Sequence, residues 1–141
     1  MELMKEKILI VDDTKAWLVF HSELINQLYG DFFEITLASS AQEGLDIVRH
    51  NIDNPFTLII SDMQMENSYE PKLAGEWFIE HVKSIPAYSR THIVLISAMY
   101  NIEYYAKTLG VECISKTLLI HNKLLLKFML EKLMPFLNII K

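Results

Sequence analysis

Cysteine, glycine, proline and long apolar runs are all scarce in this 141-residue sequence. Cys113 is the only cysteine, which excludes disulfide frameworks and cysteine-based metal clusters and favours a reducing compartment. No run approaches the about 18 apolar residues of a transmembrane helix, so we expect no membrane span. The first apolar run, at 8–11, is too short for a signal peptide. We therefore expect a cytoplasmic protein.

Basic residues are outnumbered and form no cluster. The chain has 13 lysines and arginines against 18 acidic residues, which gives a net charge of -5. A nucleic-acid surface needs a basic patch or stripe, so we expect no nucleic-acid partner. The length suits one domain with a single core, and we predict one domain over 1–141.

Short apolar segments alternate with amphipathic ones along the whole chain. The apolar segments predict strands at 7–11, 33–38, 56–62, 92–96 and 111–115. Helices are predicted after Thr14, after Ser39 or Ser40, near Gly75, from about Asn101 and from about Leu119 to Ile140. This alternation predicts an α/β fold, a doubly wound parallel sheet of five strands with five helices. The pattern does not give the strand order, and we expect the flavodoxin-like order 2-1-3-4-5 because it is the usual solution for five strands.

The prominent aromatic and histidine residues have an ordinary interpretation. Trp17, Phe20, Leu24 and Leu28 have helical spacing and predict the packed face of the first helix. The five histidines are dispersed, which indicates surface or packing positions rather than a metal site.

Polar residues that could bind a ligand or take part in a reaction lie at the ends of four of the predicted strands. They are Asp12 and Asp13 after the first, Asp62 after the third, Ser97 at the end of the fourth and Lys116 after the fifth. Parallel strands place their carboxyl ends at one edge of the sheet, where ligands of open α/β sheets bind. We therefore expect these five residues to share one site.

Three neighbouring carboxylates repel one another unless a cation compensates them. An oxygen-only ligand set suits Mg²⁺ or Mn²⁺, which often hold phosphate oxygens as well. Lys116 adds a positive charge and Ser97 a hydroxyl donor. The set therefore favours a phosphoryl group as the ligand, with Asp62 as the nucleophile that attacks the phosphorus.

With these motifs in view, the chain resembles a receiver domain of the two-component response-regulator family over about Lys5 to Met134, with an extended C-terminal helix. Residues 8–13 match the first strand and its acidic pair, Asp62 the phosphoacceptor, 97–98 the switch hydroxyl with its small neighbour, and Lys116 the conserved-type lysine. The resemblance implies that Asp13 and Asp62 bind Mg²⁺ directly, that Asp12 binds it through water, and that Gln64 contributes a backbone carbonyl.

The resemblance also implies a function. Asp62 would take a phosphoryl group from a histidine kinase or a phosphotransfer protein, and Ser97 would then move toward the phosphoaspartate. We expect a stand-alone receiver that is not an enzyme beyond its own phosphorylation and dephosphorylation. It would signal through contacts with a downstream protein whose identity the sequence does not give.

Three departures from the family pattern support an alternative. Thr117 stands where a proline usually follows the lysine, and Cys113 stands at the position of the switch aromatic. The loop from 63 to 74 lacks the usual motif and carries Glu66 in place of a proline. The alternative is a pseudo-receiver, an interaction or dimerisation module that needs no phosphoryl group. If switching is kept, Tyr100, Tyr104 or Tyr105 would replace the missing aromatic.

The C-terminal helix carries more apolar residues than one packed face requires. One stripe holds Leu126, Leu130, Leu133, Leu137 and Ile140, and a second holds Leu125, Phe128 or Met129, Phe136 and Ile139. The surplus suggests a partner surface, and we expect a homodimer or a docked protein there. The other interpretation is a broadly buried helix, or a tail that folds back after Pro135.

Two other phosphate-related classes fit poorly. A haloacid-dehalogenase-type phosphohydrolase needs acids two residues apart, and Thr14 stands two residues after Asp12. A flavodoxin needs a phosphate-binding first loop, which the two acids at 12–13 would oppose by repelling the anion.

Overall fold

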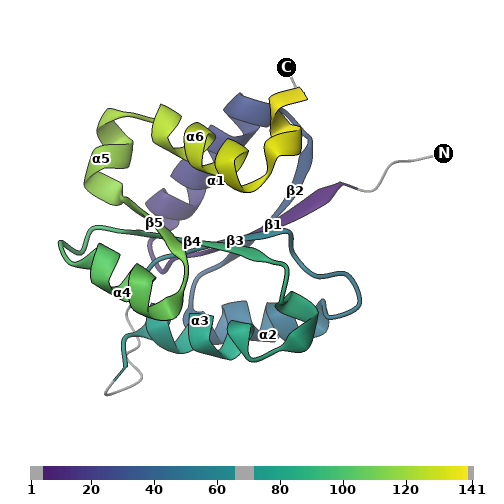
Figure 1. Ribbon diagram of the computed structural model, residues 1–141, viewed down its shortest axis with the longest axis vertical. Coiled ribbons are helices and arrows are strands. Elements are labelled where there is room, and N and C mark those ends of the chain that lie inside the picture. The colour runs from purple at the N-terminus through teal and green to yellow at the C-terminus, as the bar shows by residue number, and fades with distance from the viewer. Residues whose placement is uncertain (1–4, 66–71, 140–141) are drawn as a thin grey trace.

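The structure, a computed structural model, describes residues 5–65 and 72–139 (Figure 1). Five parallel strands form one sheet in the order β2-β1-β3-β4-β5, as the sequence predicts. The strands are β1 (Glu6–Val11), β2 (Phe33–Ala38), β3 (Leu58–Ser61), β4 (His92–Ser97) and β5 (Glu112–Ser115). The strand order reverses direction between β1 and β3, which is where open sheets of this kind bind ligands.

Helices cover both faces of the sheet (Figure 1). On one face lie α1 (Lys15–Tyr29), α5 (Lys116–His121) and α6 (Leu124–Leu133). On the other lie α2 (Ala41–His50), α3 (Ala74–Lys83) and α4 (Ile102–Leu109). Two short 3₁₀ turns, η1 (Pro86–Tyr88) and η2 (Pro135–Ile139), follow α3 and α6. Among the described residues, no helix is long and apolar enough to cross a bilayer.

The central strands are buried on both sides, which explains their continuous apolar sequences. In β1, Ile8 and Ile10 pack with α1 and α6, whereas Leu9 and Val11 pack with α2 and α3. The sheet therefore separates two hydrophobic cores, one on each face. The polar residues of interest lie at the ends of its strands.

The third strand is shorter than predicted. The apolar pattern predicts 56–62, but the ladder with β1 covers only Leu58 to Ser61. Asp62 leaves the strand, although its amide still donates to the carbonyl of Val11 at 3.0 Å. Asp62 therefore lies just beyond the ladder with its backbone held by β1.

The prediction of one C-terminal helix over 119–140 is wrong. Asn122 adopts an extended conformation that separates α5 from α6, and its Oδ1 accepts a hydrogen bond from the amide of Leu124. Pro135 ends α6 because its ring cannot continue the helical hydrogen bonding. Helix α5 also begins earlier than predicted, at Lys116 itself.

Candidate functional site

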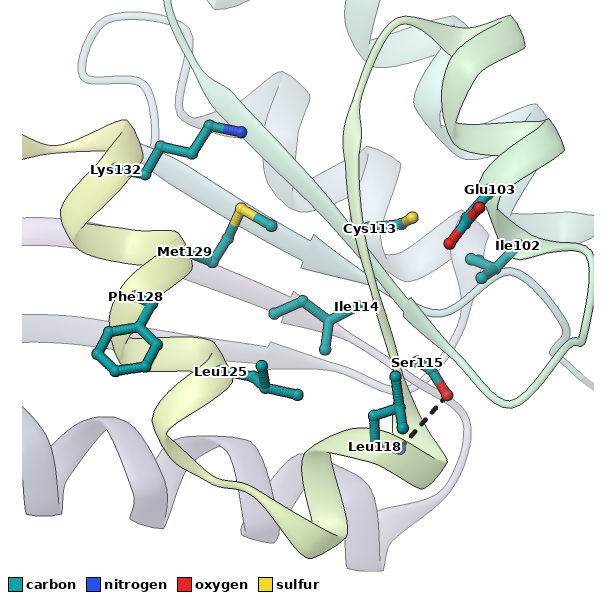
Figure 2. A pocket seen from close by; sticks show the side chains of 10 residues that line it. All are labelled: Ile102, Glu103, Cys113, Ile114, Ser115, Leu118, Leu125, Phe128, Met129 and Lys132. Atoms are coloured by element: carbon teal, nitrogen blue, oxygen red, sulfur yellow. Dashed lines mark hydrogen bonds between the residues drawn. The ribbon is translucent and has the colours of Figure 1, made fainter.

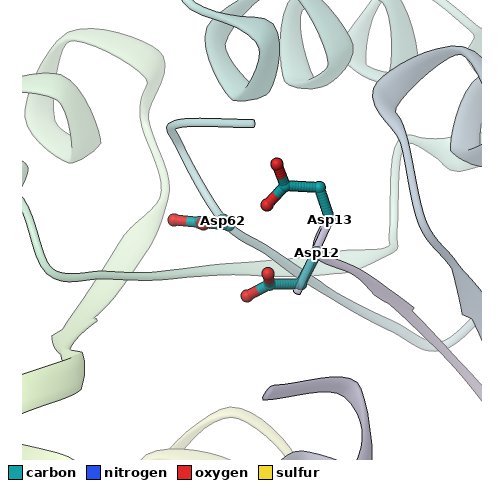
Figure 3. A group of neighbouring side chains, drawn as sticks. All are labelled: Asp12, Asp13 and Asp62. Carbon is teal, nitrogen blue, oxygen red and sulfur yellow. The ribbon is translucent and has the colours of Figure 1, made fainter. Parts of the chain in front are cut away.

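The three predicted acids meet at the carboxyl ends of β1 and β3. The register pairs Val11 with Ser61, so Asp12 and Asp62 leave neighbouring strands at the same level. One ligand oxygen from each of Asp12, Asp13 and Asp62 lies within 4.8 Å of the others. Figure 3 shows the three carboxylates side by side at these strand ends. The sequence prediction that they share one site is confirmed.

Lys116 closes the site from the neighbouring side. Its Nζ lies 2.9 Å from Asp12 Oδ2 and 3.0 Å from Asp62 Oδ2. All three side chains are buried. Ser115, the residue before Lys116, pairs with Ser97 of β4, so the fourth and fifth strands end at the same level. The predicted contact between Lys116 and the acids is therefore present.

Burial dominates the electrostatics of Asp62. It raises the pKa of this carboxyl above its ordinary value, and the negative charge of Asp12 acts in the same direction. Lys116 and the amide of Met63, which donates to Oδ1 at 2.7 Å, oppose the rise in pKa by stabilising the carboxylate. A buried carboxylate balanced in this way is sensitive to any change in the charge beside it.

The two oxygens of Asp12 have different surroundings. Its Oδ1 accepts a hydrogen bond from the amide of Thr14 at 2.9 Å. Its Oδ2 is buried and forms the ion pair with Lys116, yet has no hydrogen-bond partner among the described residues. Three carboxylates clustered in this way offer the oxygen ligands that a hard divalent cation such as Mg²⁺ prefers. The residues present therefore fit the metal that the sequence predicts.

Ser97 lies at the end of β4, and Gln64 lies in the loop after β3. Ser97 is buried at the end of β4, and its Oγ accepts a hydrogen bond from the amide of Met99 at 3.3 Å. Gln64 is exposed, two residues after Asp62. The switching role of Ser97 and the metal contact of the Gln64 carbonyl stay predictions.

The departures from the family pattern are local. Thr117 is exposed within α5, and Ser115 caps that helix by accepting from the amide of Leu118. Tyr100 and Tyr104 are exposed, whereas Tyr105 is half-buried against the core between the sheet and α3 and α4. Of these three tyrosines, Tyr105 is thus the one that packs against the core. Glu66 lies outside the described residues.

Sequence reasoning missed three residues beside the site. Gly75 donates its amide to the Met63 carbonyl and comes so close to the Asp62 backbone that a Cβ there would lie 2.2 Å from the Asp62 carbonyl oxygen. Trp17 and His21 lie on α1 next to Lys116. Trp17 and His21 are four residues apart on a helix that begins just after the acidic pair, and this position was the available signal. The apolar pattern of the helix indicated only packing.

Comparison with known proteins gives structural matches only. No family model and no curated protein matches this sequence. A response regulator receiver domain from Clostridium thermocellum is 27% identical, with a TM-score of 0.63 over 79% of this chain and 82% of that one. The chemotaxis protein CheY4 of Vibrio cholerae is 21% identical, with a TM-score of 0.63 over 78% and 84%.

A third structure matches over more of the chain. The signal receiver domain of a DNA-binding response regulator from Colwellia psychrerythraea is 20% identical, with a TM-score of 0.73 over 92% of this chain and 98% of that domain. Together with the strand order and the polar residues at the strand ends, these matches support a receiver-domain fold of the response-regulator type for this chain.

Proposed function

We propose that this receiver accepts a phosphoryl group on Asp62 from a phosphohistidine of a histidine kinase or a phosphotransfer protein. It would act in the cytoplasm as a stand-alone signalling domain, and the only chemistry that it would catalyse is its own phosphorylation and dephosphorylation. The observation that carries the proposal is the buried Asp62 carboxylate, held between Lys116 and two further acids.

The chemistry follows from these contacts. One Asp62 oxygen attacks the phosphorus, an oxygen–phosphorus bond forms, and the nitrogen–phosphorus bond breaks with its electron pair staying on the imidazole. Lys116 neutralises charge on the transferring group, since its ammonium already contacts Asp62. Asp12, Asp13 and Asp62 would hold Mg²⁺, which when bound offsets negative charge on the phosphoryl oxygens.

Phosphorylation by a small phosphodonor tests this function. With Mg²⁺ and a phosphoramidate, we expect the intact mass to rise by one phosphoryl group, and Asp62→Asn should abolish the rise. Asp53→Asn, which changes an exposed acid after α2, is the control and should leave the rise intact. A wild-type protein that neither gains the group nor binds beryllofluoride would contradict the proposal.

The pseudo-receiver remains the second candidate because Cys113 and Thr117 depart from the family pattern. It predicts the opposite result in the same experiment: no mass increase, no affinity for Mg²⁺, and partner binding that is unchanged by Asp62→Asn.

A partner surface for either function lies beside β5. An apolar pocket of about 350 Å³ opens between α4, β5, α5 and α6 (Figure 2). Leu118 and Phe128 line it and are 60% and 56% exposed, and Leu124 nearby is 49% exposed. Glu103 and Lys132 supply opposite charges at the same face. We propose that a second copy of the chain covers this face, because a face with both charges can pair with itself across a two-fold axis.

Light scattering at increasing protein concentration tests the dimer. We expect the wild-type mass to approach that of two chains, and Phe128→Asp to return it to one chain because a charge would be buried at the interface. Ile52→Asp is the matched control, since Ile52 is also exposed, at 45%, but follows α2 on the other side of the sheet. A wild-type monomer at high concentration would remove the proposal.

A further inference from the structure

The ammonium of Lys116 rests on an aromatic ring as well as on the carboxylates. Its Nζ lies 4.8 Å from the centroid of the Trp17 ring. A cation within about 6 Å of an indole centroid is attracted by the negative face of the ring, and the attraction grows when water is excluded. Lys116 is 6% exposed, so this contact is largely shielded from solvent.

The surroundings of Trp17 keep this ring in place. Phe20 meets it edge to face at 5.1 Å, and His21 lies 5.3 Å away. His21 is 1% exposed, and its Nδ1 has no hydrogen-bond partner among the described residues. Burial and the charge of Lys116 lower the pKa of His21 to about 3, so the imidazole is neutral at physiological pH. His21 is therefore not a second cation that competes with Lys116 for the ring.

The backbone around Lys116 does not by itself fix the position of the lysine side chain. Helix α5 begins at Lys116, and the next residue of the helix is Thr117, so no proline fixes the turn that presents the lysine. The long side chain must be held by what it touches, because lysine has several rotatable bonds. Phe20 contacts a second cation, Lys123, at 5.8 Å, just after α5. Aromatic rings of α1 thus contact cations at both ends of this short helix.

We propose that Trp17 is a positioning residue, which holds the Lys116 ammonium beside Asp62 and thereby supports binding of the phosphoryl group. The inference rests on the proposed phosphoryl function of Asp62. It assigns to the first helix a role in the site that its packing pattern alone does not indicate.

Affinities for Mg²⁺ and for beryllofluoride separate positioning from general packing. Trp17→Leu should weaken beryllofluoride binding by between about fivefold and about thirtyfold, the range expected for a shielded cation–ring contact. Trp17→Phe keeps a ring and should lose only about twofold to about threefold. Neither variant should weaken Mg²⁺ binding, because Trp17 acts through Lys116, whose positive charge opposes a cation at the same acids. Fluorine NMR of the bound beryllofluoride measures the loss of affinity.

Trp77→Leu is the matched control, since it makes the same substitution at the other tryptophan, which lies on α3 and packs against His81. We expect it to bind beryllofluoride as the wild type does. Unchanged beryllofluoride affinity in both Trp17 variants would overturn the inference while leaving the phosphoryl function intact. Equal weakening of Mg²⁺ and beryllofluoride would also overturn it, because that result marks a packing role. A wild-type protein that does not bind beryllofluoride would overturn the proposed function first.

A second measurement tests the contact without any phosphoryl analogue. The chain has two tryptophans, so Trp77→Phe leaves Trp17 as the only emitter. In that background, Lys116→Met should change the intensity and wavelength of the Trp17 emission, since it removes the charge from the ring. Unchanged emission would contradict the contact even if Trp17→Leu fails to fold.

Discussion

Replacing Lys116 with methionine is expected to destabilise the metal-free protein by about 3 to 5 kcal/mol at neutral pH, the usual cost of leaving a buried charge uncompensated. Asp12 and Asp62 would then face each other without the ammonium that lies 2.9 and 3.0 Å from their oxygens. Urea unfolding in the presence of a chelator measures the loss. Mg²⁺ should restore much of it, because a cation bound by the same acids replaces the missing charge.

The loss of stability in Lys116→Met should become smaller as the pH falls. Burial raises the pKa of folded Asp62 above its unfolded value, and removal of Lys116 raises that pKa further. The folded state then takes up a proton at a pH where the unfolded state does not, so stability increases as the pH falls through the folded pKa. Adding Asp62→Asn to Lys116→Met should likewise recover stability at neutral pH.

Lys132→Met is the matched control for this experiment. Lys132 also pairs with a carboxylate, at 2.7 Å from Glu112, but its side chain is 65% exposed. Exposed pairs contribute about 0 to 1 kcal/mol, so the change should be small and independent of the metal. Equal losses for the two lysine variants would contradict our account of the buried pair.

Gly75→Ala is expected to cost about 3 kcal/mol, at the upper end of the usual range for overpacking. A Cβ at this position would lie 2.2 Å from the Asp62 carbonyl oxygen and 2.6 Å from the Met63 Cα. Both are backbone atoms of the segment that carries the phosphoacceptor, so relief requires α3 and the end of β3 to separate. We therefore expect weaker Mg²⁺ binding together with a lower urea midpoint.

Gly44→Ala provides the comparison for Gly75. Its Cβ would meet side-chain atoms of Phe78 and Val11 at 3.0 Å rather than backbone, and side chains adjust more easily. We expect a smaller loss of stability and an unchanged Mg²⁺ affinity. Wild-type stability for Gly75→Ala would show that the chain tolerates a wider separation of α3 from β3.

The alternation of apolar strands and amphipathic helices predicted an α/β fold with a parallel sheet, because each pattern favours one kind of packing. The strand order came from the usual solution for five such strands and not from the pattern itself. The same local logic failed at the C-terminus. The apolar stripes there fit one helix and give no sign of the extended Asn122, whereas an end of the helix near Pro135 was among the alternatives that the sequence left open. Periodicity describes which side of a helix is apolar and says little about where a tertiary contact bends the chain.

The sequence by itself was enough to predict the residues of the candidate site: Asp12, Asp13, Asp62, Ser97 and Lys116 each follow or end a strand, and parallel strands end at one edge of a sheet. Only the tertiary structure decided what surrounds them. The approach of Gly75 to the Asp62 backbone and the contact of Trp17 with Lys116 join segments far apart in the chain. Such contacts depend on distances between packed elements, which no local pattern encodes.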